Sequence, residues 1–184
     1  MISFIIPAHN SEKFLKRCVE SVVKEEKQPK DNNLAEVIII ENGSSDHTKQ
    51  IGTALAEKYE NVFLICSEKG GSNARNAGVK AAHGEWIFFL DADDYLPAGT
   101  LQKLLDTVNS GKAADLYIFS YEKGNAIVNV ATGENAYGYE GTGVRECLAG
   151  MLRNPTRCMA VWGKLFRHSI IQQSSLDFNK KLSL

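Results

Sequence analysis

Four residues in the middle of the chain, Asp91-Ala92-Asp93-Asp94, carry its sharpest chemical signal. Hard divalent cations such as Mg²⁺ or Mn²⁺ bind carboxylate oxygens and keep open positions for phosphate oxygens and water. Two aspartates spaced i, i+2 at the end of a strand can reach the same side of a bend, so that one ion bridges the protein and a diphosphate. The alternative is an acidic helix N-cap, with Asp93 or Asp94 at the positive end of the dipole. The apolar run at residues 86–90 directly before the acids favours the metal site.

Two further segments could contact a ligand. Residues 70–76 place two glycines and the expected start of a helix beside Arg75. Helix N-termini bind anions through free backbone N–H groups, and Arg adds a forked, charge-assisted hydrogen bond; a flexible loop with a solvated Arg75 is the alternative. In residues 41–46, a carboxylate or amide could bind a base or ribose, or Gly43 could form a tight turn before a cap at Asp46.

The elements that must position these segments follow from the apolar pattern. Short apolar runs predict strands at residues 2–6, 37–40, 62–66 and 86–90. Helical spacing predicts helices at residues 14–23, 46–59, 72–82 and 100–108, with Asn10 or Ser11 capping the first and Ser72 the third. This alternation predicts a parallel sheet with helices on both faces, in which ligands bind outside the carboxyl ends of the strands. All three candidate segments lie at such ends.

The pattern is weaker after residue 110. We expect a strand at residues 116–121, a hairpin or loop at 124–143, a helix at 142–152 and a short strand at 161–166.

Composition excludes several classes of protein. The 184 residues carry 21 basic and 22 acidic side chains, a balance that argues against a nucleic-acid binder. No apolar run approaches the roughly 20 residues of a membrane span, and no signal peptide is recognisable. No dinucleotide-binding GxGxxG, P-loop or GxSxG element occurs. The cysteines show no CxxC spacing and are expected to be buried, reduced thiols; they are Cys18, Cys66, Cys147 and Cys158. We expect a cytoplasmic protein, which could be peripheral at the inner face of a membrane.

Four segments together resemble the nucleotide-sugar-dependent glycosyltransferases of family 2. They are residues 2–10 (ISFIIPAHN), 37–48 (VIIIENGSSDHT), 74–94 (ARNAGVKAAHGEWIFFLDADD) and 161–167 (VWGKLFR). The resemblance implies the GT-A fold, an α/β, Rossmann-like and mostly parallel sheet with helices on both faces and a small C-terminal acceptor-side subregion. Residues 1–110 would form the donor-binding half, and residues 111–184 an incomplete acceptor-side half of the same domain.

The resemblance also implies roles for individual residues. Asp93 is the expected ligand of Mg²⁺ or Mn²⁺, Asp91 reaches the metal or the ribose, and Asp94 supports them. The other implied donor-binding residues are Pro7, Ala8, Asn10, Glu41, Asn42, Arg75 and Ala92, and the implied acceptor-side residues are Trp162 and Lys164. The family usually has Asp-Asp or Asp-Asn where this chain has Glu41-Asn42, so which of the two contacts the base stays open.

The implied reaction moves a sugar from a nucleoside diphosphate donor, expected to be a UDP-sugar, to a hydroxyl of a sugar or lipid-linked sugar, with inversion. Such a step would serve surface polysaccharide or glycoconjugate synthesis. Family members carry the general base in a Glu-Asp pair after the Trp-Gly-Lys segment, and we expect that pair beyond Leu184, so that none of the 184 residues is assigned as catalytic. Two alternatives stay open: a fragment that binds a nucleotide sugar without transfer, and a phosphatase of the haloacid dehalogenase type.

Overall fold

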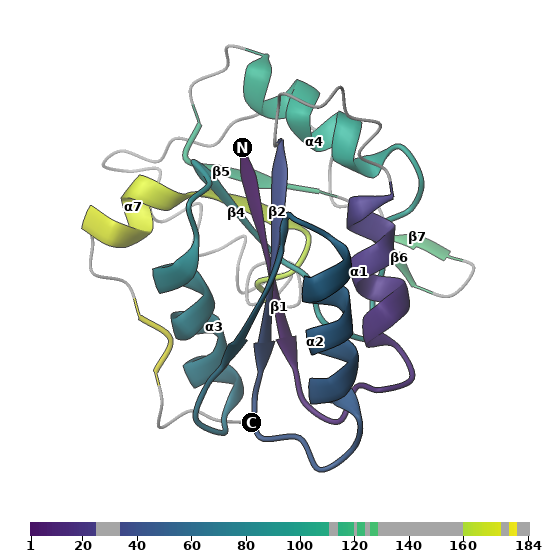
Figure 1. Ribbon diagram of the computed structural model, residues 1–184. Helices are drawn as coiled ribbons and strands as arrows, with labels where there is room; N and C mark the ends of the chain where they lie inside the picture. Colours follow the sequence, from purple (N-terminus) through teal and green to yellow (C-terminus); the bar gives the residue numbers. More distant parts are fainter. Residues whose placement is uncertain are drawn as a thin grey trace.

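A six-stranded sheet forms the centre of the protein (Figure 1). The computed structural model describes residues 1–24, 34–110, 114–119, 121–123, 126–128, 160–173 and 177–179. The strand order is β3-β2-β1-β4-β8-β5, and a separate hairpin pairs β6 with β7. The strands are β1 (Ile2–Ala8), β2 (Ala35–Glu41), β3 (Val62–Cys66), β4 (Trp86–Phe89), β5 (Leu116–Ile118), β6 (Tyr121–Lys123), β7 (Ala126–Val128) and β8 (Lys164–Arg167). Strands β1 to β4 run parallel and β8 is antiparallel to both its neighbours, which confirms the mostly parallel α/β sheet.

Helices cover both faces of the sheet, as expected. Successive side chains of a strand point to opposite faces, so Phe4 and Ile6 belong to one apolar cluster and Ile5 to another. The first cluster is covered by α1 (Leu15–Val23), α2 (Thr48–Lys58) and α4 (Thr100–Asn109), and the second by α3 (Gly71–Ala81) and α7 (His168–Gln173). Figure 1 shows α3 and the α1–α2 pair on opposite sides of the sheet.

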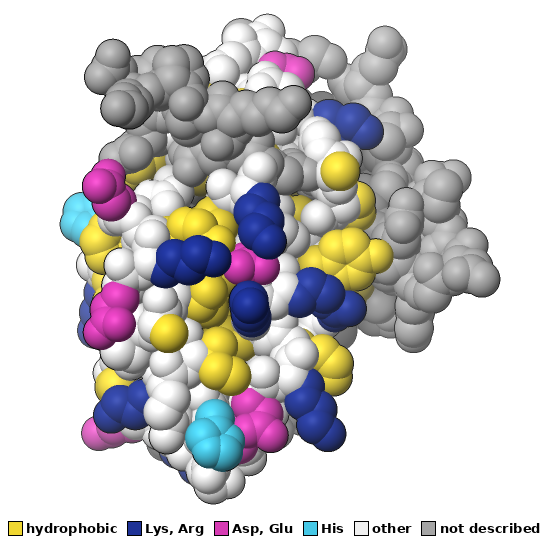
Figure 2. All heavy atoms as spheres, turned by 45° about the vertical axis from the view of Figure 1, so that its right-hand side comes forward, with side chains coloured by type: hydrophobic (Ala, Val, Ile, Leu, Met, Phe, Trp, Pro, Cys, Tyr) yellow, Lys and Arg dark blue, Asp and Glu magenta, His cyan; other side chains and the backbone are white. Residues whose placement is uncertain are grey.

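Charged side chains connect the outer surfaces of α1 and α2. Glu20 of α1 accepts hydrogen bonds from Lys24 (2.8 Å), Lys58 of α2 (3.3 Å) and the hydroxyl of Tyr59 (3.2 Å). The bond from Lys24 contributes most to lowering the pKa of Glu20, to about 2. Figure 2 shows this face of the molecule, where Lys and Arg side chains lie among acidic and apolar ones. The two helices are therefore joined by charge outside as well as by apolar packing inside.

The starts of two helices differ from the sequence expectation. No side chain caps α1, which begins after Phe14; instead the carbonyl of Ser11 accepts from the amide of Leu15 (2.9 Å). Ser72 lies inside α3, which follows Gly70 at a positive φ of 128°. The chain enters α3 in this conformation because the amide of Gly70 donates to Asn42 across the sheet edge (2.7 Å), a tertiary contact that local propensity does not contain.

The expectations for the segments after residue 110 and for the cysteines have different outcomes. The expected strand at 116–121 is divided between β5 and β6, and the one at 161–166 corresponds to β8. Cys18 is buried as expected, but the same expectation is wrong for Cys66, which is exposed at the end of β3 because this strand pairs only with β2 among the described residues. The expected helix at 142–152, most of the segment 124–143, and Cys147 and Cys158 lie outside the described residues.

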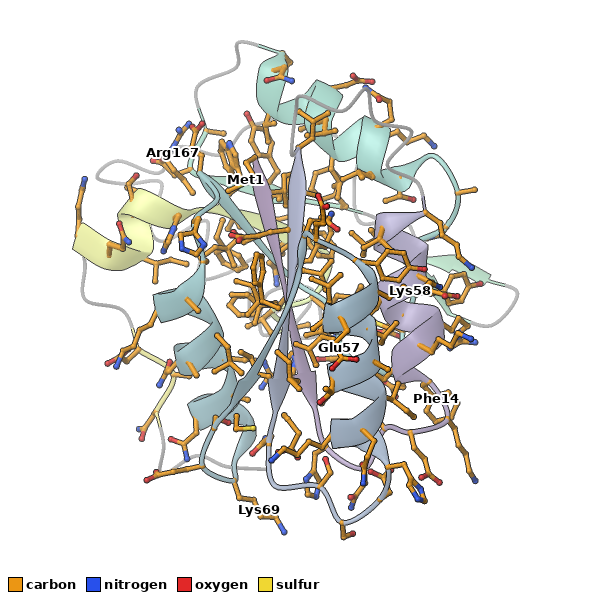
Figure 3. All side chains as sticks on the ribbon, in the orientation of Figure 1. Met1, Phe14, Glu57, Lys58, Lys69 and Arg167 are labelled. Carbon is orange, nitrogen blue, oxygen red and sulfur yellow. The ribbon has the colours of Figure 1, made fainter. Side chains whose placement is uncertain are left out.

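A buried carboxylate joins the amino ends of the strands. Glu36 of β2 lies opposite Ser3 of β1 in the sheet register and accepts a hydrogen bond from its hydroxyl (2.5 Å). The amides of His83 (2.6 Å) and Gly84 (3.2 Å) donate to the same oxygen. Figure 3 shows Met1 and Arg167 at this end of the molecule and Lys69 at the other. The network fixes the start of β4 against β1 and β2 and leaves the opposite edge of the sheet to the candidate site.

No helix in the part of the chain that the structure describes has the length and apolar character needed to cross a bilayer.

Candidate functional site

The carboxyl ends of β1, β2 and β4 meet at one edge of the sheet. Ala8 lies opposite Glu41 in the register of β1 and β2, and its carbonyl accepts from the amide of Asn42 (3.0 Å). The carbonyl of Ile5 accepts from the amide of Leu90 (3.0 Å), which brings the acidic turn beside the end of β1. The structure thus gathers the expected donor-binding segments at this edge, although Ala8 is itself buried.

Both candidates for the base contact use a side-chain oxygen to build their own loop. Glu41 and Asn42 are 6% and 5% exposed. An oxygen of Glu41 accepts from the amide of Ser44 (2.6 Å), and Oδ1 of Asn42 accepts from the amide of Gly70 (2.7 Å). Gly43, which follows Asn42, has a φ of +70°, as a tight turn requires. The expected turn is present, and Asp46 accepts from the amide of Thr48, the first residue of α2 (2.9 Å), but the N-cap position is His47 and no side chain caps it.

The loop after β1 is bound to the loop after β2. Asn10 has a positive φ of 50°, and its Oδ1 accepts from the amide of Ser45 (2.9 Å). His9 lies with Nδ1 2.9 Å from the carbonyl oxygen of Asn42. Asn10 therefore borders the site and shapes it through Ser45 rather than standing free.

Residues 91–94 form a turn and do not cap a helix. The amide of Asp94 donates to the carbonyl of Asp91 (2.9 Å), and the next helix, α4, begins only at Thr100. The N-cap alternative is therefore wrong. Asp91 is half-buried, Ala92 is 5% exposed and Asp93 is exposed. The turn buries its alanine as an apolar anchor while the aspartates on either side reach solvent.

Arg75 of α3 reaches the acidic turn. Its Nη2 lies 3.3 Å from Oδ1 of Asp91, and the side chains are 25% and 33% exposed. The guanidinium also lies over the ring of Phe178, 5.8 Å from the centroid. The Nε atom is buried and has no hydrogen-bond partner among the described residues. Arg75 is therefore not a solvated side chain, and the exposed part of its guanidinium lies next to a carboxylate, where an anion could also be bound.

The charge distribution in the turn suits a divalent cation. Burial raises the pKa of the Asp94 carboxyl, and repulsion from Asp93 and Asp91 raises it further. A field that disfavours a third negative charge favours a bound cation. Among the described residues no three His, Cys, Asp or Glu side chains are arranged as a metal site. Asp91 and Asp93 supply carboxylates on one turn, the donor set of an ion that takes one or two carboxylates from the protein and its other oxygens from phosphate and water.

The acceptor-side residues lie on the neighbouring part of the sheet. Trp162 is half-buried and forms an isolated bridge with Phe89 at the end of β4. Lys164 is 4% exposed in β8, and its ammonium donates to the carbonyl of Ala160. The burial of Lys164 reflects packing within the sheet, so of the two residues Trp162 is the better placed to meet a ligand.

Two contacts in this region were missed at the sequence level. Asn76 of α3 exchanges hydrogen bonds with the backbone of Phe178: its Nδ2 donates to the carbonyl (3.0 Å) and its Oδ1 accepts from the amide (2.8 Å). Arg17 of α1 donates to the carbonyl of Asp93 (2.7 Å). These pairs are 102 and 76 residues apart in the chain, so no local spacing could indicate them.

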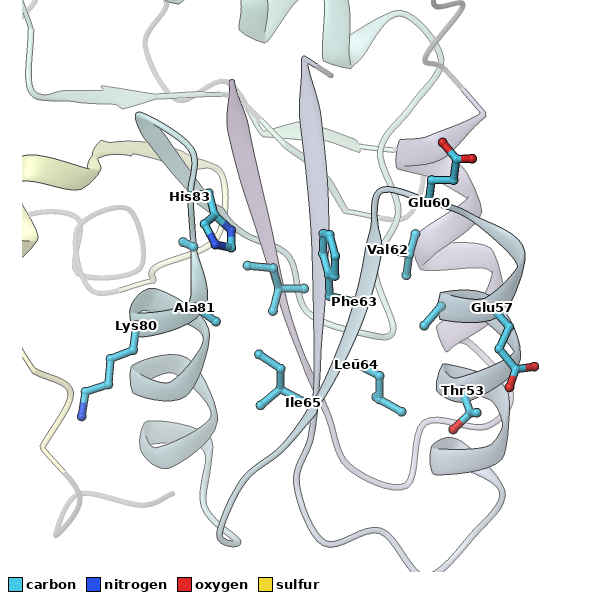
Figure 4. Close-up of a pocket in the computed structure, with 13 residues that line it drawn as sticks. Thr53, Glu57, Glu60, Val62, Phe63, Leu64, Ile65, Lys80, Ala81 and His83 are labelled. Atoms are coloured by element: carbon cyan, nitrogen blue, oxygen red, sulfur yellow. The ribbon is translucent and has the colours of Figure 1, made fainter. Parts of the chain in front are cut away.

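An open hollow elsewhere on the molecule contains none of the expected donor residues. It measures about 670 Å³ and lies along the β3 edge, between Glu57 and Glu60 on one side and Lys80 and His83 on the other (Figure 4). Phe63, 45% exposed, forms part of its lining.

Comparison with known proteins agrees with this geometry. Residues 3–171 match the family model described as Glycosyl transferase family 2. The glycosyltransferase EpsH of Bacillus subtilis is 30% identical over 183 residues, which cover 96% of this chain and 50% of EpsH. The poly(ribitol-phosphate) beta-glucosyltransferase of Bacillus spizizenii is 38% identical over 103 residues, which cover 54% of this chain and 16% of that protein.

Solved structures show the same fold. S. aureus TarS 1-349 has a TM-score of 0.76 at 23% identity, covering 100% of this chain and 51% of that one. The mannosyltransferase PcManGT from Pyrobaculum calidifontis, in complex with GDP-Man and Mn²⁺, has a TM-score of 0.63 at 17% identity, covering 97% and 47%. The fold is therefore the GT-A fold, as the sequence resemblance implied. The chain spans about half the length of EpsH and of these two structures.

Proposed function

This chain belongs to glycosyltransferase family 2, and from that premise we propose that it binds a nucleoside diphosphate sugar and transfers the sugar to an acceptor hydroxyl. The observation that carries the proposal is the meeting of Arg75, Asp91 and the exposed Asp93 at the carboxyl edge of a parallel sheet. Ligands of open parallel sheets bind at this edge. TarS has been solved with UDP and with UDP-GlcNAc, which supports a UDP-sugar as donor.

The donor would lie across the three loops. Pro7 and Ala8 end β1 and Asn10 follows it, while Glu41 ends β2 and Asn42 follows it, and a base and ribose would be bound beside these residues. Arg75 would donate to the diphosphate through the exposed part of its guanidinium and stabilise the negative charge that develops there. Asp91 and Asp93 would hold Mg²⁺ or Mn²⁺, which when bound neutralises charge on the departing diphosphate.

The proposed reaction is a single displacement with inversion. The acceptor oxygen bonds to the anomeric carbon, the bond from that carbon to the diphosphate oxygen breaks, and the acceptor proton passes to a general base. We assign no described residue as that base. The acceptor is proposed to be a sugar or lipid-linked sugar held near Trp162, with Lys164 supporting the strand beneath it. Relatives named for succinoglycan biosynthesis and for poly(ribitol-phosphate) glucosylation favour a role in polysaccharide synthesis.

Calorimetry with UDP, with and without Mn²⁺, tests the donor site. We expect binding that the metal strengthens, and a thermal-shift series of nucleotide sugars should then rank the donors, because stabilisation grows with ligand concentration relative to Kd. Absence of UDP binding under both conditions would refute the proposal. Binding without transfer to any acceptor would support the nucleotide-sugar-binding alternative, and phosphate release from a generic phosphoester would support a phosphatase.

A further inference from the structure

Helix α1 holds the acidic turn and the residues just after it by three side chains. Arg17 donates from Nη2 to the carbonyl of Asp93 (2.7 Å), and Cys18 donates from Sγ to the carbonyl of Asp91 (3.6 Å). Ser21 accepts from the amide of Leu96 (3.0 Å). Ser21 follows Arg17 by four positions and Cys18 by three, the spacings of neighbours on a helix. The turn is thus attached to α1 at Asp91 and Asp93, and the segment after it at Leu96.

Arg17 is the strongest of these attachments. Its guanidinium carries a full charge and also lies over the ring of Tyr95, 4.9 Å from the centroid, and at 5.9 Å from that of Phe14. The contact of Cys18 is a long hydrogen bond from a weak donor. Since Arg17 binds the carbonyl of Asp93, it orients the residue without occupying the carboxylate that a ligand would need.

We propose that Arg17 is a positioning residue for the donor site: it fixes the backbone at Asp93 so that the exposed carboxylate is held ready for a divalent cation bridging to the donor diphosphate. The inference rests on the proposed function, since it presumes that Asp93 serves that cation. Two observations carry it, namely the 2.7 Å bond to the Asp93 carbonyl and the stacking of the same guanidinium on Tyr95, which follows the acidic turn directly.

Removing Arg17 has two effects of opposite sign on metal binding. A positive charge near the acidic turn repels a second cation, so charge alone predicts tighter Mn²⁺ binding when Arg17 is neutralised. Loss of the bond to Asp93 frees the turn and predicts weaker binding, because the carboxylate must then be ordered when the ion binds. The direction of the change therefore distinguishes a positioning role from a purely electrostatic one.

The experiment uses the 184-residue chain with Arg17→Met, Arg17→Lys and the control Lys16→Met. Met keeps the straight stem and helix propensity of Arg without its charge or donors, and Lys16 is exposed on the same helix. Mn²⁺ alone is titrated by electron paramagnetic resonance of the free ion, UDP by calorimetry with and without Mn²⁺, and the thermal midpoint is recorded for each variant.

We expect Arg17→Met to reduce both Mn²⁺ affinity and the Mn²⁺-dependent gain in UDP affinity about fivefold, the scale of one exposed charged hydrogen bond. Metal-free UDP affinity should match that of Lys16→Met, and Arg17→Lys should be intermediate. Unchanged or tighter Mn²⁺ binding in Arg17→Met, or an equal loss with and without metal, would overturn the inference alone. Failure of the unaltered chain to bind UDP under either condition would overturn the proposed function as well.

Discussion

The carboxylate of Asp91 lies 3.3 Å from the guanidinium of Arg75, although the two residues come from different elements, the end of β4 and the second turn of α3. The pair places a carboxylate that could bind a cation beside a guanidinium that could bind an anion. A diphosphate bound through a metal needs both at once. The relationship makes the two residues a unit, and it predicts that altering either will change nucleotide binding more than it changes stability.

Replacing Arg75 should weaken diphosphate binding. Arg75→Ala removes the guanidinium donors and the positive charge beside Asp91, and we expect UDP affinity to fall by about 1.5 kcal/mol, roughly tenfold, the lower range for a charged hydrogen bond. Lys80→Ala is the matched control, because Lys80 is exposed on the same helix. Calorimetry with UDP and Mn²⁺ measures the difference. Equal affinities in the two variants would show that Arg75 serves only the fold.

Replacing Asp93 should remove the metal dependence of binding. Asp93→Asn keeps the shape of the side chain but loses the charge that a hard cation requires, so UDP should bind this variant equally with and without Mn²⁺. The thermal midpoint should stay within about 2 °C of the unaltered chain, since exposed surface substitutions usually change stability by less than about 0.5 kcal/mol. Asp106→Asn, at an exposed position of α4, is the control. A Mn²⁺ effect that persists in Asp93→Asn would contradict the assignment.

The sequence predicted the parts of the fold that depend on local pattern. Strands β1 and β2 are buried on both faces, so their apolar runs indicated them directly. Helix α1 buries Leu15, Cys18, Val19 and Val22, a spacing that is visible without a structure. The edge at which the candidate segments meet followed from the strand–helix alternation. The division at residue 110 into donor and acceptor halves stays a prediction.

Contacts between distant segments could not be predicted in this way. The cap expected at Ser72 was wrong because the amide of Gly70, which has a positive φ, donates to Asn42, 28 residues before Gly70. The hydrogen bond from Arg17 to Asp93 could not be predicted for the same reason, since the two residues are 76 positions apart in the chain. Helix propensity and hydrophobic periodicity describe neighbours in the chain, whereas these side chains bind backbone groups of other elements. The site was therefore located from sequence, but the residues that shape it were not.

Close packing of α3 on the sheet should make Gly78 intolerant of a side chain. A Cβ at this position would lie 2.3 Å from Cγ2 of Ile5, a fully buried residue of β1. We expect Gly78→Ala to lower the free energy of unfolding by about 1–3 kcal/mol, the usual cost of overpacking a core. Urea denaturation measures this, with Lys80→Ala as the control on the same helix. Stability equal to that of the control would mean that α3 can move away from β1.

The buried carboxylate of Glu36 should make stability depend on pH. Burial raises its pKa, but the hydrogen bonds from Ser3 and from His83 outweigh burial, so the pKa is lowered from its ordinary value of 4.5. A lowered pKa in the folded state means that the ionised group stabilises the fold at neutral pH and that this contribution is lost as the pH falls through 4.5 toward the folded value.

Glu36→Gln tests this linkage by removing the charge at nearly constant shape. We expect the variant to be about 1–2 kcal/mol less stable at pH 7, as for a buried hydrogen-bonded charge, with the gap narrowing as the pH falls below 4.5. The control is Glu57→Gln, because Glu57 is exposed on α2. Urea midpoints across this pH range measure both variants. A gap that stays constant with pH would show that Glu36 is held by shape and neutral hydrogen bonds, because only the ionised carboxylate loses its advantage on protonation.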